Sequence, residues 1–453
     1  MEPALDTGLH LNRQIGLVGA TALVVGGVIG AGIYVMVAEI GALAGYASWL
    51  AFAAAMLMSL VGVLPLIQTA GALPQAGAGY FFCSRLLSPY WGVLMSYWVI
   101  LGGGASTTVV AVTLARYAEH YVSLPVPTNV IAGAIVLAFY GVYTFGLRLA
   151  MPLQIIMTLQ FLLALLLYAG AGVWDTGLEM DLVPPHGLPA FLMAVLLSYS
   201  TCMGFQVIAE MGEEIKEPRK NIPLALLIGG AIVSVIYILV VTVFVVALKG
   251  DGDAMRALKA PLTISAEGFL PPALIGFLSL GAITAALTSL NAGAIAIPRE
   301  WFAQARDGIA PHWLGAISPR TRTPQHAVTA FMLWVLMLLA LGQSMDFYGY
   351  CAAIGILVLS SAICLAALRL PKRFPKHLAR AYIRFPQGLM WGCAIVTLLV
   401  TLVFVAVIAI ELPSVLALYA FWTLAVSVGY RVKTRTFSPA QWAALAAVPE
   451  VED

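Results

Sequence analysis

The chain has 453 residues, of which 61% are hydrophobic and 10% are Asp, Glu, Lys or Arg, and its formal net charge is +2. A soluble domain normally carries about 25% charged residues, so there are too few here to cover a water-facing surface. This composition excludes a soluble enzyme and a disordered chain, and the near-neutral charge gives no reason to expect a nucleic-acid partner.

Long apolar runs recur along the whole chain and predict about twelve membrane-spanning helices. If the N-terminus is cytoplasmic, most Lys and Arg residues fall in cytoplasmic connections. The opposite side keeps Arg116, Lys249, Arg256 and Lys259. Because short cytoplasmic loops are enriched in Lys and Arg, we expect a multi-pass protein with both termini in the cytoplasm. The short loops are typical of a prokaryotic inner membrane, so the cell membrane is the expected location.

The first apolar run contains Gly26, Gly27, Gly30 and Gly32. Each Gly weakens a helix by roughly 1 kcal/mol relative to Ala. A broken helix is tolerated in lipid where it lines a cavity or is buried in protein. The run therefore predicts either a discontinuous helix whose free backbone groups bind a ligand, or close helix packing through Gly26 and Gly30.

The sixth apolar run contains a polar stretch from Ser198 to Gln206, and Glu210 follows it. Its Ser and Thr side chains could simply bond back to carbonyls of a continuous helix. The two unusual runs are five spans apart, however. An inverted repeat of five spans would place two helix breaks in corresponding positions near the bilayer midplane, where transporters bind substrate.

Four segments form a recognisable set: GGVIGAGI at 26–33, LPQAGAGY at 73–80, GFQVIAEMGEEIKEPRKNIP at 204–223, and REWFAQARDG at 299–308 within 291–324. Together they resemble the amino acid–polyamine–organocation superfamily of transporters, from the first span to the tenth. The resemblance implies an all-α polytopic membrane protein with a 5+5 inverted repeat, discontinuous helices 1 and 6, and two additional C-terminal helices.

On this resemblance, one transmembrane transporter domain covers residues 1–453. Its parts would be a first repeat at 15–175, a second repeat at 189–370, two additional helices at 385–431 and a cytoplasmic tail at 432–453. The implied function is secondary active transport of an amino acid or amine by alternating access, and not enzymatic catalysis.

A half-helix that begins near Gly30 would point its backbone N–H groups at an anion. We therefore expect the α-carboxylate of a substrate at Gly30, Ala31 and Gly32. The carbonyls expected to accept from an α-ammonium are those of Val28, Ile29, Ser200 and Thr201. Tyr199 and Phe205 are candidates to cover the substrate, although aromatic side chains in membrane helices commonly serve packing alone.

Two amides stand where many relatives carry an acidic residue, Gln206 in the sixth run and Gln68 in the second. The loss of both charges favours a substrate with a neutral side chain. Glu210 is a candidate for coupling or gating, because an ionisable group at membrane depth is costly and usually functional. It could equally lie at the membrane interface.

The coupling ion is open between Na⁺, H⁺ and none, and no other cofactor is expected. Some proton-coupled relatives use a Lys in the fifth span, where the alignment places Phe161, so the lysine mechanism is in doubt. Ala285, Thr288 and Ser289 share one helical face. With the carbonyls of Gly26 and Ile29 they resemble the Na⁺ site of sodium-coupled transporters of this fold; small-residue helix packing is the alternative.

Charged residues after the sixth span can pair across the cytoplasmic side with Arg299, Arg306 or Asp307. They are Glu213, Glu214, Lys216, Arg219 and Lys220. Such a network could hold one end of the protein closed, although exposed pairs contribute little individually. Besides a Na⁺-coupled carrier, the sequence leaves an ion-independent exchanger and a proton-coupled permease open, with a channel or a non-transporting receptor as distant alternatives. It identifies neither the substrate nor a partner subunit.

Overall fold

The computed structural model describes residues 11–30, 32–121, 126–143 and 145–448. Among these residues, nine helices are long and apolar enough to cross a membrane, and three shorter apolar helices accompany them. Each of the twelve predicted apolar runs contains helix. This part of the chain contains helices, turns and two isolated β-bridges but no β-strand. The prediction of an all-α polytopic membrane protein is confirmed, whereas the division into two inverted repeats stays a prediction.

The first five spans are α1 (Leu17–Ile29) with α2 (Gly32–Ala44), α3 (Ser48–Ala72), α5 (Pro89–Tyr121), α6 (Thr128–Tyr143) and α7 (Leu147–Thr176). The next five are α8 (Gly187–Thr201) with the 3₁₀ turn η3 (Phe205–Ile208), α9 (Pro218–Ala247), α12 (Pro272–Ala296) with α13 (Pro298–Arg306), α14 (Gln325–Leu341) and α15 (Met345–Arg373). The last two are α17 (Gln387–Glu411) and α18 (Pro413–Thr434). Several begin with Pro at the first helical position, where its missing N–H costs no helical hydrogen bond.

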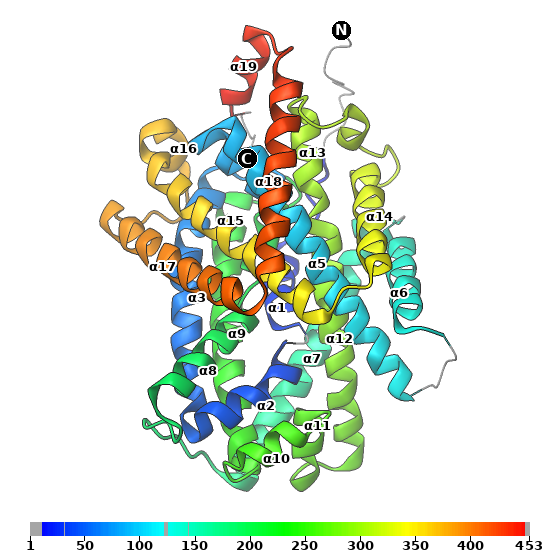
Figure 1. The fold of residues 1–453 in the computed structure, drawn as a ribbon, viewed down its shortest axis with the longest axis vertical. Coiled ribbons are helices and arrows are strands. Elements are labelled where there is room, and N and C mark those ends of the chain that lie inside the picture. Colours follow the sequence, from blue (N-terminus) through cyan, green and yellow to red (C-terminus); the bar gives the residue numbers. More distant parts are fainter. Residues whose placement is uncertain (1–10, 31, 122–125, 144, 449–453) are drawn as a thin grey trace.

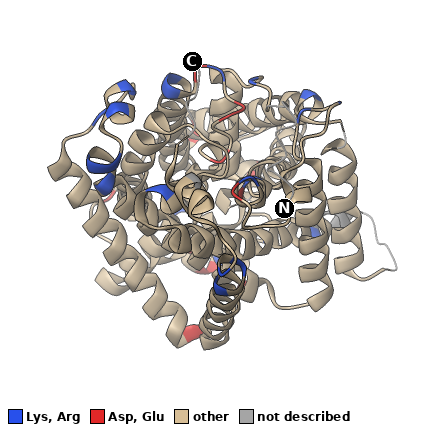
Figure 2. Cartoon of the chain, turned by 90° about the horizontal axis from the view of Figure 1, so that it is seen from above, with Lys and Arg blue, Asp and Glu red and all other residues tan. Residues whose placement is uncertain are grey.

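Short helices lie between and after the spans. They are α4 (Ala78–Phe82) with the π turn η2 (Cys83–Leu87), α10 (Gly252–Ala257), α11 (Pro261–Ser265), α16 (Pro375–Arg380) and α19 (Pro439–Ala446). Figure 1 shows α16 and α19 at one end of the molecule and α10 and α11 at the other. We call these the α16 end and the α10 end. Figure 2 looks onto the α16 end, where Lys and Arg positions lie mostly around the rim and Asp and Glu positions lie nearer the centre.

Helix α1 packs against α7, α9 and α12. Its side chains Leu23, Val24 and Ile29 are fully buried. Helix α5 packs along α15, and α17 covers α15 and α3 from the outside. A helix that is apolar all round can be buried in this way, so α1 occupies the middle of the bundle and its glycine-rich end lies at the centre of the protein (Figure 1).

Candidate functional site

Both predicted helix breaks are present. Helix α1 ends at Ile29, and Gly30 takes φ 44° and ψ −152° before α2 begins at Gly32. Helix α8 ends at Thr201, and Gly204 takes φ 126° before the turn η3. Backbone with these φ values is strained for residues that carry a Cβ, so glycine allows both interruptions. Ala31, predicted to bind the carboxylate, lies outside the described residues.

The two breaks lie side by side beneath Tyr237 of α9. The Tyr237 hydroxyl is 2.9 Å from the Thr201 carbonyl oxygen, 3.2 Å from that of Val28 and 3.4 Å from that of Ile29. A Cβ atom added to Gly32 would lie 3.3 Å from the side chain of Thr201. Three of the carbonyls predicted to receive an ammonium group thus converge on one point.

A cavity of about 420 Å³ lies against both breaks. This volume is within the range of about 300–1,000 Å³ typical of small-molecule sites. Of the predicted substrate-binding residues, those that line it are Val28, Ile29, Gly30, Gly32, Ser200 and Thr201. Polar side chains of α5 join them at Ser106, Thr107 and Thr113. Gln206 also lines it, and its amide nitrogen donates to the Ser360 hydroxyl of α15 at 2.6 Å.

The cavity extends from the breaks toward the α10 end. Its lining includes Val35 and Met36 of α2 and Met345 at the start of α15. Val35 and Met36 are 41% and 37% exposed. Glu210 also lines the cavity, but it is only 3% exposed. The exposed large apolar side chains of its lining thus lie on α2.

The two aromatic candidates lie away from this cavity. The Tyr199 ring packs against Phe404 of α17, with ring centroids 5.5 Å apart. Phe205 is 1% exposed, and its ring lies close to Gly230 of α9. Both side chains line a separate small pocket with Ser59 and other residues. In this structure the Tyr199 and Phe205 side chains therefore pack against α17 and α9, and their role at a substrate stays a prediction.

Oxygen atoms do converge where the sequence predicts a Na⁺ site. The Gly26 carbonyl oxygen lies 3.3 Å from the Thr288 hydroxyl and 3.1 Å from the Ser289 hydroxyl. The Thr288 hydroxyl also donates to the Ala285 carbonyl at 2.7 Å. The fifth predicted ligand, the Ile29 carbonyl, faces Tyr237. Four of the five residues thus form one cluster of neutral oxygens between α1 and α12.

The side chains of the fifth span that face this cluster are Gln154 and Thr158. A Cβ added to Gly26 would overlap the Gln154 amide nitrogen and lie 3.1 Å from the Thr158 hydroxyl. The Gln154 amide donates to the Ala22 carbonyl at 3.2 Å and accepts from Asn291 at 2.7 Å. The family alignment does not point to Gln154, although an amide inside an apolar run is a signal that could have indicated it.

Phe161 occupies a different level of the fifth span. It is fully buried, and its backbone lies against Gly281 of α12. Phe161 lies seven positions after Gln154, which corresponds to about 10 Å along a helix. Phe161 therefore belongs to the apolar packing of α7 on α12. Gln154 is the residue of the fifth span whose side chain lies against Gly26.

The α16 end is closed by ion pairs that the sequence partly predicts. Arg299 binds Glu214 through two hydrogen bonds of 2.9 and 3.0 Å, and both side chains are almost completely buried. Arg306 pairs with Glu213 at 2.6 Å nearer the surface. These pairs join the turn after η3 to α13, so the two polypeptide segments are fixed together at this end.

Asp307 pairs with Arg85 of η2, which was not among its expected partners. The two N–O distances are 2.6 and 3.0 Å, and the Tyr80 hydroxyl donates to the same carboxylate. Burial, followed by the negative charge of Asp307, raises the pKa of Tyr80 well above its usual range, so this hydroxyl keeps its proton. Arg85 also donates to the Ala447 carbonyl at 2.9 Å, which ties the chain after α19 to this network.

The carboxyl groups of Glu210 and Glu300 lie near these ion pairs and bind neighbouring N–H groups of α4. The Gly79 N–H donates to Glu210 at 3.3 Å, and the Tyr80 N–H donates to Glu300 at 2.9 Å. Glu210 Oε2 and Glu300 Oε1 are buried, and neither has a hydrogen-bond partner among the described residues. Two buried carboxylates near each other cannot both be charged at low cost. A proton shared between them would lower that cost.

Comparison with known proteins agrees with this geometry. The sequence pattern described as amino acid permease matches residues 15–430. An uncharacterized transporter of Mycobacterium tuberculosis (strain ATCC 25618 / H37Rv) is 29% identical over 80% of this chain and 81% of its own length. The branched-chain amino acid permease BcaP of Bacillus subtilis is 24% identical over 82% and 83%. The human cationic amino acid transporter 4 is 26% identical over 74% and 56%.

Proposed function

The chain belongs to the amino acid permease family, and from this premise we propose that it carries an amino acid across the cell membrane by alternating access. The observation that supports this most is the cavity at the meeting point of two interrupted helices. In a membrane helix, free backbone N–H and C=O groups are tolerated where they line such a cavity. They are also the groups that a zwitterion needs.

The proposed substrate is an α-amino acid with a neutral side chain. Its carboxylate would lie against the N-terminal end of α2, at Gly30 and Gly32, where the helix dipole is positive. Its ammonium would lie against the carbonyls of Val28, Ile29 and Thr201. Among the residues that line the cavity, Glu210 alone is ionisable. A cationic side chain would thus find one carboxyl group, already engaged with Glu300.

The distribution of Lys and Arg supports a cytoplasmic α16 end. The cavity would then open to the outside, and the ion pairs of Arg299 and Arg306 would close the cytoplasmic end. Alternating access requires these contacts to separate when the cavity opens inward. In this proposal, the structure corresponds to the outward-facing half of the cycle.

Na⁺ is the first candidate for the coupling ion. Support comes from the carbonyls of Gly26 and Ala285 and the hydroxyls of Thr288 and Ser289, because a hard cation prefers such oxygens. A cation between α1 and α12 would stabilise α1 in its present position beside the cavity. Uptake would then be driven by the Na⁺ gradient.

A proton is the second candidate, supported by the contact between Glu210 and Glu300. Glu210 follows η3 and lines the cavity, whereas Glu300 belongs to α13. Opening the α16 end would separate the two carboxyl groups, and each would then ionise easily. The proton held between them would be released on that side.

Uptake of radiolabelled neutral amino acids into proteoliposomes tests the proposed transport. We expect accumulation driven by a Na⁺ gradient. Accumulation driven by a pH gradient alone would favour the proton, and dependence on internal amino acid alone would favour an exchanger. Absence of uptake under all three conditions would contradict transport and favour a receptor, while flux that does not saturate would indicate a channel.

The variant Gly30→Leu tests the carboxylate position. A Cβ at Gly30 would overlap the Ser289 hydroxyl, so a leucine side chain would occupy the cavity. We expect loss of substrate binding with retention of the folded protein in detergent. Gly170→Leu is the matched control, because a Cβ at Gly170 meets no atom within 4 Å. Undiminished uptake by Gly30→Leu would contradict the assignment.

A further inference from the structure

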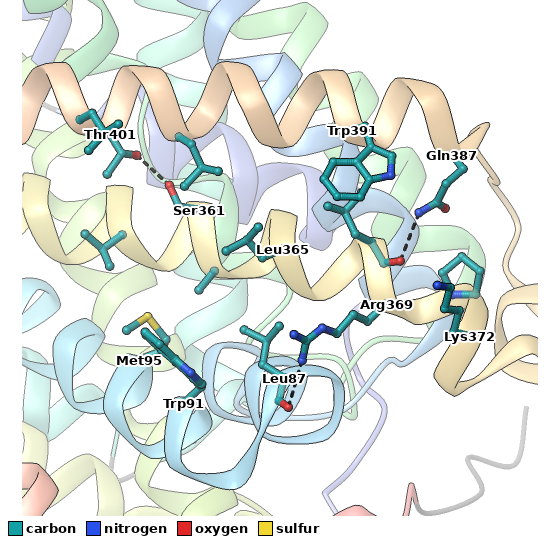
Figure 3. Close-up of a pocket in the computed structure, with 16 residues that line it drawn as sticks. Leu87, Trp91, Met95, Ser361, Leu365, Arg369, Lys372, Gln387, Trp391 and Thr401 are labelled. Atoms are coloured by element: carbon teal, nitrogen blue, oxygen red, sulfur yellow. Dashed lines mark hydrogen bonds between the residues drawn. The ribbon is translucent and has the colours of Figure 1, made fainter.

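A second, larger cavity lies on the outside of the bundle, between the start of α5 and the second half of α15, with α17 as its other wall. Its volume is about 1000 Å³. Figure 3 shows its lining, with Trp391 on α17 and Trp91 on α5. The side chains along it are mostly apolar, including Met95, Leu365 and Leu402. We call this cavity the lateral groove.

The lateral groove faces the membrane. Leu402 and Trp391 of α17 are 62% and 55% exposed, and Trp91 is 47% exposed. The hydroxyls of Ser361 and Thr401 in its wall are hydrogen-bonded to each other at 2.8 Å. A stretch of wall whose hydroxyls are satisfied and whose apolar side chains are exposed suits hydrocarbon better than a polar solute.

One end of the lateral groove is positively charged. Arg369 and Lys372 line it there, both exposed. One guanidinium nitrogen of Arg369 donates to the Leu87 carbonyl at 3.3 Å, as Figure 3 shows. Guanidinium has five N–H groups, so most remain available. Among the described residues, neither side chain takes part in an ion pair.

The surrounding connection reinforces this charge. From residue 369 to residue 386 the chain contains no Asp or Glu. Its basic residues are Arg369, Lys372, Arg373, Lys376, Arg380 and Arg384. A basic pocket between membrane helices, next to an apolar groove, is complementary to an anionic lipid headgroup with its acyl chains. The exposed tryptophans fit the same boundary, where indole rings prefer to lie between lipid headgroup and hydrocarbon.

The dimensions match one lipid within one leaflet. Along α17, the lining extends from Gln387 to Leu402. Fifteen residues of helix correspond to about 22 Å, and half of a hydrocarbon core is about 15 Å thick. A tilted helix of this length can accompany an acyl chain from its headgroup to the middle of the bilayer.

We propose that the lateral groove binds an anionic phospholipid, with the phosphate at Arg369 and Lys372 and an acyl chain along Leu365 and Leu402. This site is separate from the substrate cavity, but the two share a wall. Val358 of α15 lines the lateral groove, and the next residue, Leu359, lines the substrate cavity. A bound lipid therefore supports the helix that forms one side of the substrate site.

Native mass spectrometry of the full-length protein in detergent tests the proposal. Phosphatidylglycerol and phosphatidylcholine with identical acyl chains are the probes. Each basic side chain attracts an anionic lipid by about 1 kcal/mol, so the two together are expected to favour phosphatidylglycerol about thirtyfold. We expect Arg369→Gln with Lys372→Gln to remove this preference. Arg380→Gln with Arg384→Gln, an equal charge change in the same connection, is the matched control and should retain it.

Two further measurements distinguish binding of a lipid from binding of another ligand. Leu365→Trp would fill the groove and leave both charges, so it should weaken binding of both lipids. Inorganic phosphate has the charge but no acyl chain and should not compete with phosphatidylglycerol. Equal binding of the two lipids by the unaltered protein would overturn the proposal. So would an unchanged preference in the double variant at Arg369 and Lys372, competition by phosphate, or a lipid-free dimer held through this surface.

Discussion

The carbonyl group of Gly27 lies directly against Gly204, so the two interrupted helices touch through their main chains. A Cβ atom at Gly204 would overlap the Gly27 carbonyl oxygen and lie 2.8 Å from its carbonyl carbon. Gly204 also has φ 126°, a conformation that strains other residues. The contact and the dihedral angle exclude a side chain at this position independently.

We therefore predict that Gly204→Ala separates the two breaks and abolishes substrate binding. Overpacking and backbone strain together should cost about 3 kcal/mol of stability. Thermal denaturation in detergent and a binding assay would measure both effects. Gly170→Ala, in open space on α7, should change neither. Normal binding by Gly204→Ala would show that the breaks need not touch.

The buried pair of Arg299 and Glu214 should matter far more than the exposed pair of Arg306 and Glu213. Arg299→Ala leaves a buried carboxylate without its counter-charge, which costs about 3–5 kcal/mol. Arg306 is 40% exposed at its side chain, so Arg306→Ala should cost about 0–1 kcal/mol. Melting temperatures of the two variants test this order. Similar losses would indicate that Glu214 finds another partner.

If the closed form keeps one proton between Glu210 and Glu300, it binds one proton more than the open form, and lower pH should favour closure of the α16 end. In Glu210→Gln, an amide can donate to Glu300 without a bound proton. Uptake measured between about pH 5 and pH 8 should therefore become less dependent on pH in this variant. Glu213→Gln, in the same turn, should keep the original profile. Identical profiles for both variants would argue against the shared proton.

The hydroxyls of Thr288 and Ser289 should determine any response to Na⁺. The double variant Thr288→Ala with Ser289→Ala removes two of the four clustered oxygen ligands, so the Na⁺ concentration for half-maximal uptake should rise by an order of magnitude or more. Thr284→Ala, one turn earlier on α12, is the control. If the unaltered protein transports equally well with Na⁺ or K⁺, these oxygens serve helix packing.

The predictable features are those carried by composition and by glycine. Apolar runs indicate spans, the glycine cluster that includes Gly30 indicates the first break, and the polar stretch from Ser198 to Gln206 indicates the second. The pairing of Glu214 with Arg299 also follows from motifs near the same membrane face. Each of these features depends on local sequence or on the side of the membrane.

Features that depend on how helices rotate against one another were harder to predict from the sequence. Tyr199 and Phe205 point toward α17 and α9, and the rotation of α8 that decides this is set by packing. For the same reason, Gln154 rather than Phe161 faces Gly26. Glu300 was missed as a partner of Glu210 because 90 residues separate them in the chain and neither motif indicates the contact.

Tyr237 carries a single hydroxyl hydrogen, yet three main-chain carbonyls surround it at 2.9 to 3.4 Å. It can satisfy one of them at a time, so these carbonyls keep unused acceptor capacity toward Tyr237, whose side chain is fully buried. A primary ammonium has three hydrogens to offer there, whereas a quaternary one has none. If the substrate ammonium lies at these carbonyls as proposed, this position would favour ligands by the number of N–H bonds they bring, whatever their side chain.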